Sequence, residues 1–168
     1  MAVRIMVKSA LFTALMAICA WITVPVGSMV FTLQTFGIFL ALLVLGGQWG
    51  TISVCLYLLM GFVGLPVFSG FQGGFGILFT PNGGYLLGFL LCALVYWLVE
   101  SLTKIRPIAL LAGFAACYAG AGLWFLFLNV LYPNVSVVLS LYVLPYIPLD
   151  FLKLAAAAFL ARRLRRFS

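Results

Sequence analysis

The stretch YIPLDFLKLAAAAFLARRLRR, residues 146–166, combines a long apolar run with an Asp and a Lys three positions apart, and it ends in four arginines. The rest of the chain holds one further acidic residue, Glu100. A long apolar run closed by basic residues is typical of a helix that crosses a membrane with its basic end in the cytoplasm. The stretch therefore predicts a spanning helix with a charge pair in its apolar part.

The composition of the whole chain agrees with a membrane protein. Of the 168 residues, 67% are hydrophobic and 7% are charged, whereas soluble domains are about half apolar and about a quarter charged. A bilayer core about 30 Å thick needs about 20 residues per helix, which leaves room for about five or six spans. We therefore expect one all-α integral membrane domain over residues 1–168, with no separate soluble domain.

Residue types with catalytic or metal-binding chemistry are scarce. The chain has no His, and Asp and Glu total two, which leaves little for a metal site or for an acid and a base acting together. The four cysteines lie in separate apolar runs without a CxxC pair, and the nine scattered basic residues are too few for a nucleic-acid-binding face. We expect no enzyme activity, no metal, no cofactor and no bound nucleic acid.

The order of apolar runs and basic residues predicts the topology. Six runs can be separated, at about residues 4–24, 36–46, 49–64, 84–101, 107–131 and 137–162. With both termini in the cytoplasm, eight of the nine basic residues lie on the inner side: Arg4, Lys8, Lys104, Arg106, Arg162, Arg163, Arg165 and Arg166. This arrangement obeys the positive-inside rule. The sequence therefore predicts six transmembrane helices with both termini cytoplasmic.

The ninth basic residue, Lys153, shares one face of the last predicted helix with Asp150 at i and i+3. Nine residues separate Lys153 from Arg162, about 14 Å of helix, so the pair lies about halfway across the membrane or higher. A charge at that depth usually faces a protein interior or a water-filled site. The pair is either a structural ion pair or part of a polar ligand site. Glu100 is expected to pair with Lys104, four residues further on.

Other polar groups are predicted on the same outer side, in two loops. The segments FTLQTF (residues 31–36) and FTPNGGY (residues 79–85) offer Thr32, Gln34, Thr35, Thr80, Asn82 and Tyr85. Amides, hydroxyls, a carboxylate and an ammonium among aromatic residues describe a concave site for a small amphipathic molecule. The first segment also fits a plain interfacial belt of aromatic residues.

A strip of small side chains lies near the start of the chain. Ala10, Ala14 and Ala17 recur at helical spacing. Such strips allow helices to approach closely in membranes. The strip either packs inside the protein or faces another membrane subunit.

Four stretches resemble the BioY family, the membrane-embedded substrate-binding (S) components of biotin transporters of the energy-coupling-factor (ECF) type. In family order they are FTLQTFGIFLALLVLGGQWG, YLLMGFVGLPVFSGFQGGFG, TPNGGYLLGFLL and LPYIPLDFLKLAAAAFLARRLRR. The resemblance implies the six-helix S-component fold in a prokaryotic plasma membrane, with biotin bound near the outer face. The site residues it implies match Asn82, Tyr85, Asp150 and Lys153, with Gln34 as a further candidate.

The resemblance also implies protein partners. Ala10 and Ala14 match an AxxxA pattern that faces the transmembrane coupling (T) subunit, and two ATPase subunits complete the transporter. This chain has no GxxxxGK[ST] motif, so either such partners supply the energy of ATP or the protein works as a facilitator. Two alternatives remain open: an S component for another vitamin, and a non-transport membrane protein in which Asp150 and Lys153 form a structural pair.

Overall fold

The computed structural model of the chain describes residues 2–26, 29–128 and 144–164. These residues form six α-helices: α1 (Ala2–Trp21), α2 (Gln34–Leu45), α3 (Gly47–Phe62), α4 (Pro81–Thr103), α5 (Arg106–Leu128) and α7 (Tyr146–Leu164). Two short strands, β1 (Thr23–Val26) and β2 (Met29–Thr32), follow α1, and two 3-10 turns, η1 (Ser69–Phe71) and η2 (Phe75–Phe79), lie between α3 and α4.

The helices agree with the six predicted apolar runs, so the predicted all-α architecture and helix count are confirmed for the part of the chain described. Three segments, Val3–Trp21, Asn82–Thr103 and Arg106–Leu128, are long and apolar enough to cross a membrane by length and composition. The last helix begins at Tyr146. The earlier part of its predicted run, residues 137–143, lies outside the described residues.

The antiparallel hairpin of β1 and β2 was not predicted. It pairs Thr23 with Thr32 and Val26 with Met29. The first strand contains Pro25, and proline cannot donate a hydrogen bond to a sheet. In a two-stranded sheet each strand has a free edge, and there a proline is tolerated. The hairpin connects α1 to the start of α2.

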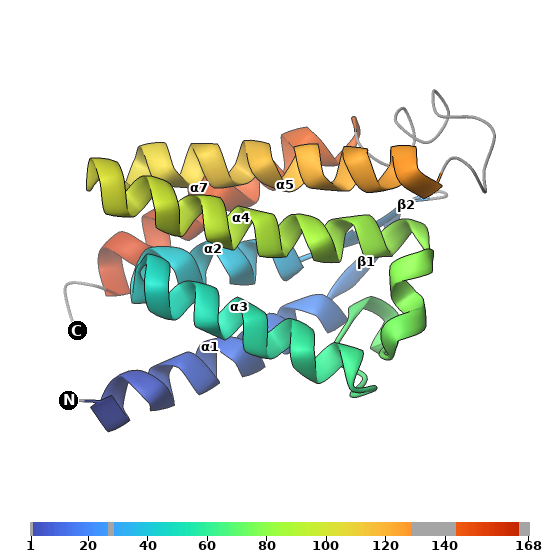
Figure 1. Cartoon of the computed structure of the whole chain (residues 1–168), viewed down its shortest axis with the longest axis horizontal. Helices are drawn as coiled ribbons and strands as arrows, with labels where there is room; N and C mark the ends of the chain where they lie inside the picture. The colour runs from blue at the N-terminus through green and yellow to red at the C-terminus, as the bar shows by residue number, and fades with distance from the viewer. Residues whose placement is uncertain (1, 27–28, 129–143, 165–168) are drawn as a thin grey trace.

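Helix α2 lies at the centre of the bundle (Figure 1), in contact with α1, α3, α4, α5 and α7. Its side chains are buried around most of its circumference, and Ile38, Ala41 and Leu42 have no exposed surface. A helix that is apolar on all sides, as this one is, fits a buried position. The short apolar run predicted at residues 36–46 corresponds to this helix, which has 12 residues.

Helices α4 and α5 run side by side in opposite directions along the upper edge of Figure 1. Small residues allow their close contact. A Cβ atom at Gly88 would lie 2.5 Å from the carbonyl oxygen of Cys117, and one at Gly113 would lie 2.9 Å from that of Cys92. Both cysteines are buried free thiols at this contact, which gives them a packing role.

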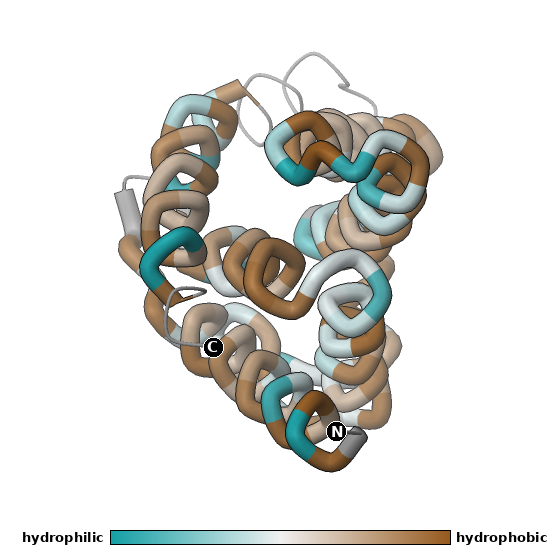
Figure 2. The backbone as a smooth tube through the Cα atoms, turned by 90° about the vertical axis from the view of Figure 1, so that its left-hand side faces the viewer, coloured by the Kyte–Doolittle hydropathy of each residue, from teal (hydrophilic) through white to brown (hydrophobic). Residues whose placement is uncertain are grey.

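Hydrophilic residues mark the helix termini at one end of the bundle (Figure 2). The start of α1, the end of α7 and the α4–α5 turn lie at the left end of Figure 1, and Figure 2 looks onto that end. There the hydrophilic segments lie at the helix ends, whereas the helix bodies are mostly apolar and expose leucines such as Leu11, Leu59, Leu98 and Leu126. This pattern fits a multi-pass membrane protein.

Glu100 pairs with a different residue from the one expected. Arg106 Nε donates to its Oε1 at 2.7 Å, and its Oε2 accepts the backbone N–H of Gly47 at the start of α3. The predicted Glu100–Lys104 pair is wrong because α4 ends at Thr103. Lys104 then adopts a left-handed backbone with φ 59°, so the helical i,i+4 geometry does not reach it.

Candidate functional site

A cavity of about 550 Å³ opens near the hairpin and the segment between α3 and α4. Its volume falls in the usual range of small-molecule pockets, about 300 to 1,000 Å³. All five residues expected at a ligand site line it: Gln34, Asn82, Tyr85, Asp150 and Lys153. They come from α2, α4 and α7, so the fold brings together groups that lie far apart in the sequence.

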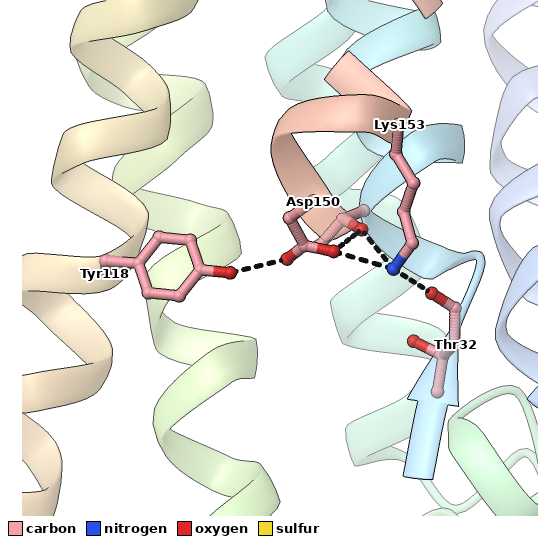
Figure 3. A network of polar contacts seen from close by, with 5 residues as sticks. Thr32, Tyr118, Asp150 and Lys153 are labelled. Carbon is pink, nitrogen blue, oxygen red and sulfur yellow. Dashed lines mark hydrogen bonds and ion pairs between the residues drawn. The ribbon is translucent and has the colours of Figure 1, made fainter. Parts of the chain in front are cut away.

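Asp150 is the most buried charged residue of this cavity, with 3% of its surface exposed. Its Oδ1 accepts hydrogen bonds from Lys153 Nζ at 2.6 Å and from Thr35 Oγ1 at 2.9 Å. Its Oδ2 accepts one from the hydroxyl of Tyr118 at 2.7 Å (Figure 3). A buried charge is tolerated when it is paired and hydrogen-bonded in this way.

Lys153 reaches from α7 to the end of the hairpin (Figure 3). Its Nζ donates to the carbonyl oxygen of Thr32 at 2.6 Å and to Asp150 Oδ1 at 2.6 Å. A longer contact of 3.4 Å joins it to Thr35 Oγ1. The charge pair therefore connects α7 to both β2 and α2, in addition to neutralising itself.

The start of α7 explains where this pair lies. Pro148 falls in its first turn, where the missing N–H costs little, and the helix begins at Tyr146. Asp150 is therefore the fifth residue of the helix. Asp150 then lies near the positive end of the helix dipole, which favours a carboxylate.

Gln34, the first residue of α2, is 4% exposed. Its Nε2 donates to the hydroxyl of Tyr57 at 2.6 Å, and that hydroxyl donates to the carbonyl oxygen of Val67 at 3.0 Å. Tyr57 has no exposed surface. This chain of bonds fixes the amide of Gln34 and ties it to the segment that follows α3.

Asn82 and Tyr85 lie in the first turns of α4. Tyr85 belongs to an aromatic wall, with its ring centroid 5.8 Å from that of Tyr146 and 6.0 Å from that of Phe125. Thr80, proposed from the same sequence segment, instead donates to the carbonyl oxygen of Ile77 at 2.7 Å. Its hydroxyl is therefore used in the turn that precedes α4.

Three tyrosines of this region were not predicted. Tyr57 and Tyr118 hold Gln34 and Asp150 by hydrogen bonds, and Tyr146 lines the cavity. A single Tyr in an apolar helix carries no sequence signal of its own, because such residues are common at membrane interfaces and in cores. Only the fold shows which hydroxyl meets which partner.

The predicted alanine strip divides on α1. Ala10 and Ala14 lie on the exposed side of the helix, beside the exposed side chains of Val7 and Leu11. Ala17 is buried, with 6% of its surface exposed. Ala17 therefore packs inside the protein, while Ala10 and Ala14 leave a flat, apolar surface open.

Metal-binding clusters are absent from the part of the chain that the structure describes, since no three His, Cys, Asp or Glu residues lie together there. The polar groups of the cavity are amides, hydroxyls and one charge pair, which suit an organic molecule with several hydrogen-bonding atoms.

Comparisons with known proteins agree on one family. The BioY family model matches residues 1–168. The biotin transporter BioY of Thermotoga maritima is 39% identical over 163 residues, covering 97% of this chain and 96% of that protein. The biotin transporter BioY of Rhodobacter capsulatus is 32% identical over 173 residues, covering 94% and 90%.

A solved structure has the same fold. The S-component for biotin from an ECF-type ABC transporter matches with a TM-score of 0.81 and 28% identity, covering 98% of this chain and 92% of that one. The resemblance seen in the four sequence stretches is thereby confirmed. Because the match extends over the whole sequence, this chain belongs to the BioY family.

Proposed function

We propose that this chain binds biotin in the 550 Å³ cavity and serves as the S component of an ECF-type transporter. The observation that carries the proposal is the convergence of Gln34, Asn82, Tyr85, Asp150 and Lys153 on one cavity. Two comparisons support the choice of ligand: the relatives are named biotin transporters, and the solved structure of the same fold is an S-component for biotin. The activity is capture and transport, not catalysis.

The chemistry of biotin suits these groups. Biotin has a ureido ring that donates and accepts hydrogen bonds, an apolar thiophane ring and a carboxylate tail. A carboxylate offers about four acceptor positions, and Asp150 uses three of them. The remaining acceptor position is on Oδ2. At neutral pH the carboxylate of biotin is ionised, so the ureido N–H groups are the hydrogen-bond donors that can fill this position.

The other site residues complete the proposed contacts. Lys153 and Asn82 donate to oxygen atoms of biotin, and Gln34 adds an amide at the start of α2. Tyr85 and its neighbouring rings pack against the apolar thiophane. A molecule without the ureido group would leave buried polar atoms unpaired, at about 1 to 3 kcal/mol each, so selectivity for biotin follows.

The proposal extends to the assembly and its orientation. As a single substrate-binding domain over residues 1–168, the chain would lie in a prokaryotic plasma membrane with both termini cytoplasmic and the cavity near the outer face. The basic residues at one end of the bundle support that orientation. Ala10 and Ala14 would contact the T subunit, two ATPase subunits would supply energy, and the chain would reorient as a rigid body.

A competition assay tests the choice of ligand. Labelled biotin is bound to the detergent-purified chain and displaced with unlabelled biotin, riboflavin or thiamine. We expect displacement by biotin alone at micromolar concentration. Displacement by riboflavin or thiamine at concentrations as low as for biotin would assign the site to another vitamin.

A further inference from the structure

Helices α5 and α7 meet beside the cavity through few contacts among the described residues. Helix α7 packs chiefly on α2, whereas α5 packs chiefly on α4. Between them, the ring of Phe114 approaches that of Phe151, with centroids 6.4 Å apart, and Tyr118 donates its hydrogen bond to Asp150. In Figure 3 the Tyr118 side chain reaches from α5 towards the carboxylate on α7.

The Tyr118 hydroxyl acts on one particular oxygen. It lies 2.7 Å from Asp150 Oδ2, while Lys153 and Thr35 both donate to Oδ1. Oδ2 is also the oxygen with an acceptor position left for a ligand. Tyr118 itself is not among the residues that line the cavity. Any effect of its hydroxyl on the ligand therefore passes through Asp150.

The ring of Tyr118 has a separate role from its hydroxyl. Its centroid lies 5.1 Å from that of Phe114 and 6.3 Å from that of Tyr85, the latter in an edge-to-face contact. Phenylalanine keeps these ring contacts, so substitution of Tyr118 by Phe removes the hydrogen bond and leaves the packing in place.

We propose that Tyr118 is a positioning residue for biotin, because its hydroxyl aims Asp150 Oδ2 at the ureido ring. The inference rests on the proposed function, since it needs biotin in the cavity. Without this bond the carboxylate keeps its two partners on Oδ1 but can rotate about its side-chain torsions. Hydrogen bonds to charged groups are strong enough that the affinity for biotin is expected to fall about tenfold or more.

The test compares Tyr118→Phe with Tyr96→Phe as a matched control. Tyr96 is a fully buried tyrosine of α4, about three helical turns beyond Tyr85, and it does not line the cavity. Calorimetric titration with biotin gives the dissociation constant and the fraction of binding-competent protein separately. A residue that merely supported the fold would lower the competent fraction and the thermal midpoint.

We expect Tyr118→Phe to raise the dissociation constant for biotin about tenfold, with an unchanged competent fraction. The same factor is expected for desthiobiotin, which retains the ureido ring, and Tyr96→Phe should leave both constants as in the wild type. Wild-type affinity in Tyr118→Phe, or a loss confined to the competent fraction, would overturn the inference. If the wild-type chain fails to bind biotin, the proposed function itself is wrong.

Discussion

Asp150 shows at the scale of single residues how this apolar protein keeps a charge in its interior. Its oxygens accept from Lys153, Thr35 and Tyr118. The sequence predicted the first of these partners, because i and i+3 share a helix face. The other two come from α2 and α5, and no local pattern could have revealed that they meet α7.

Lys153 is the residue whose loss should affect ligand binding most. Lys153→Ala removes an ammonium that holds Thr32 and Asp150, and it leaves a buried carboxylate without its counter-charge, which is costly. We expect the affinity for biotin to fall at least tenfold in calorimetric titration. The matched control is Arg162→Ala, an exposed cation near the other end of α7. Near-normal affinity in Lys153→Ala would refute its place in the site.

The cavity is shaped by the packing of α2, α4 and α7 and by the segment between α3 and α4. The sequence predicted the six helices because apolar runs of that length have few other uses. It did not predict the hairpin or the α4–α5 contact, since both depend on tertiary neighbours. Gly88 and Gly113 carry no signal until the facing carbonyl groups are known.

The α4–α5 contact predicts that alanine substitution changes the stability of the protein differently at two glycines. Gly88→Ala would place a Cβ 2.5 Å from the backbone oxygen of Cys117, and such overpacking costs about 1 to 3 kcal/mol. At Gly122, on α5, nothing lies within 4 Å, so Gly122→Ala should be neutral or stabilise the helix by about 0.5 to 1 kcal/mol. Thermal unfolding in detergent should give a lower midpoint for Gly88→Ala only; equal midpoints would argue against this contact.

The segment between α3 and α4 is held by Trp21 at the end of α1. The indole Nε1 donates to the carbonyl oxygen of Pro66 at 2.8 Å, and the ring stacks on Phe71 with centroids 5.1 Å apart. Neighbouring residues Ser69 and Gln72 line the cavity. The position of this part of the cavity wall therefore depends on α1.

We expect Trp21→Ala to speed the release of biotin. Loss of the hydrogen bond and the ring contact, at about 1 kcal/mol or more, corresponds to about a fivefold faster dissociation or greater. Stopped-flow displacement of labelled biotin measures this rate. Trp97→Ala, at a half-exposed position of α4 outside this cavity, is the control. Equal dissociation rates in the two variants would contradict a role for Trp21 in retaining the ligand.

In the whole molecule, the cavity and the flat, exposed strip of Ala10 and Ala14 lie on different parts of one bundle. Composition and charge order were enough to predict a membrane protein with an inner, basic end, because the bilayer limits which structures can span it. The cavity at the other end could be expected only in outline. Its shape depends on how α2, α4 and α7 approach one another, which no run of residues specifies.

Separation of these two surfaces predicts that transport can be lost without loss of binding. Ala14→Trp would place a large ring on the flat, exposed side of α1 and block close approach of another helix. We expect biotin uptake with the partner subunits to fall at least tenfold, while the dissociation constant of the isolated chain is unchanged. Ala155→Trp, at an exposed alanine of α7, should retain uptake. Normal uptake in Ala14→Trp would exclude this face as the partner contact.

Calorimetric titration of the purified wild-type chain with biotin shows whether this bundle is a biotin-binding protein. We predict tight binding of one biotin per chain, with no heat of binding from riboflavin under the same conditions. Folded protein that binds no biotin would rule out the proposed function and would leave Asp150 and Lys153 as a structural ion pair.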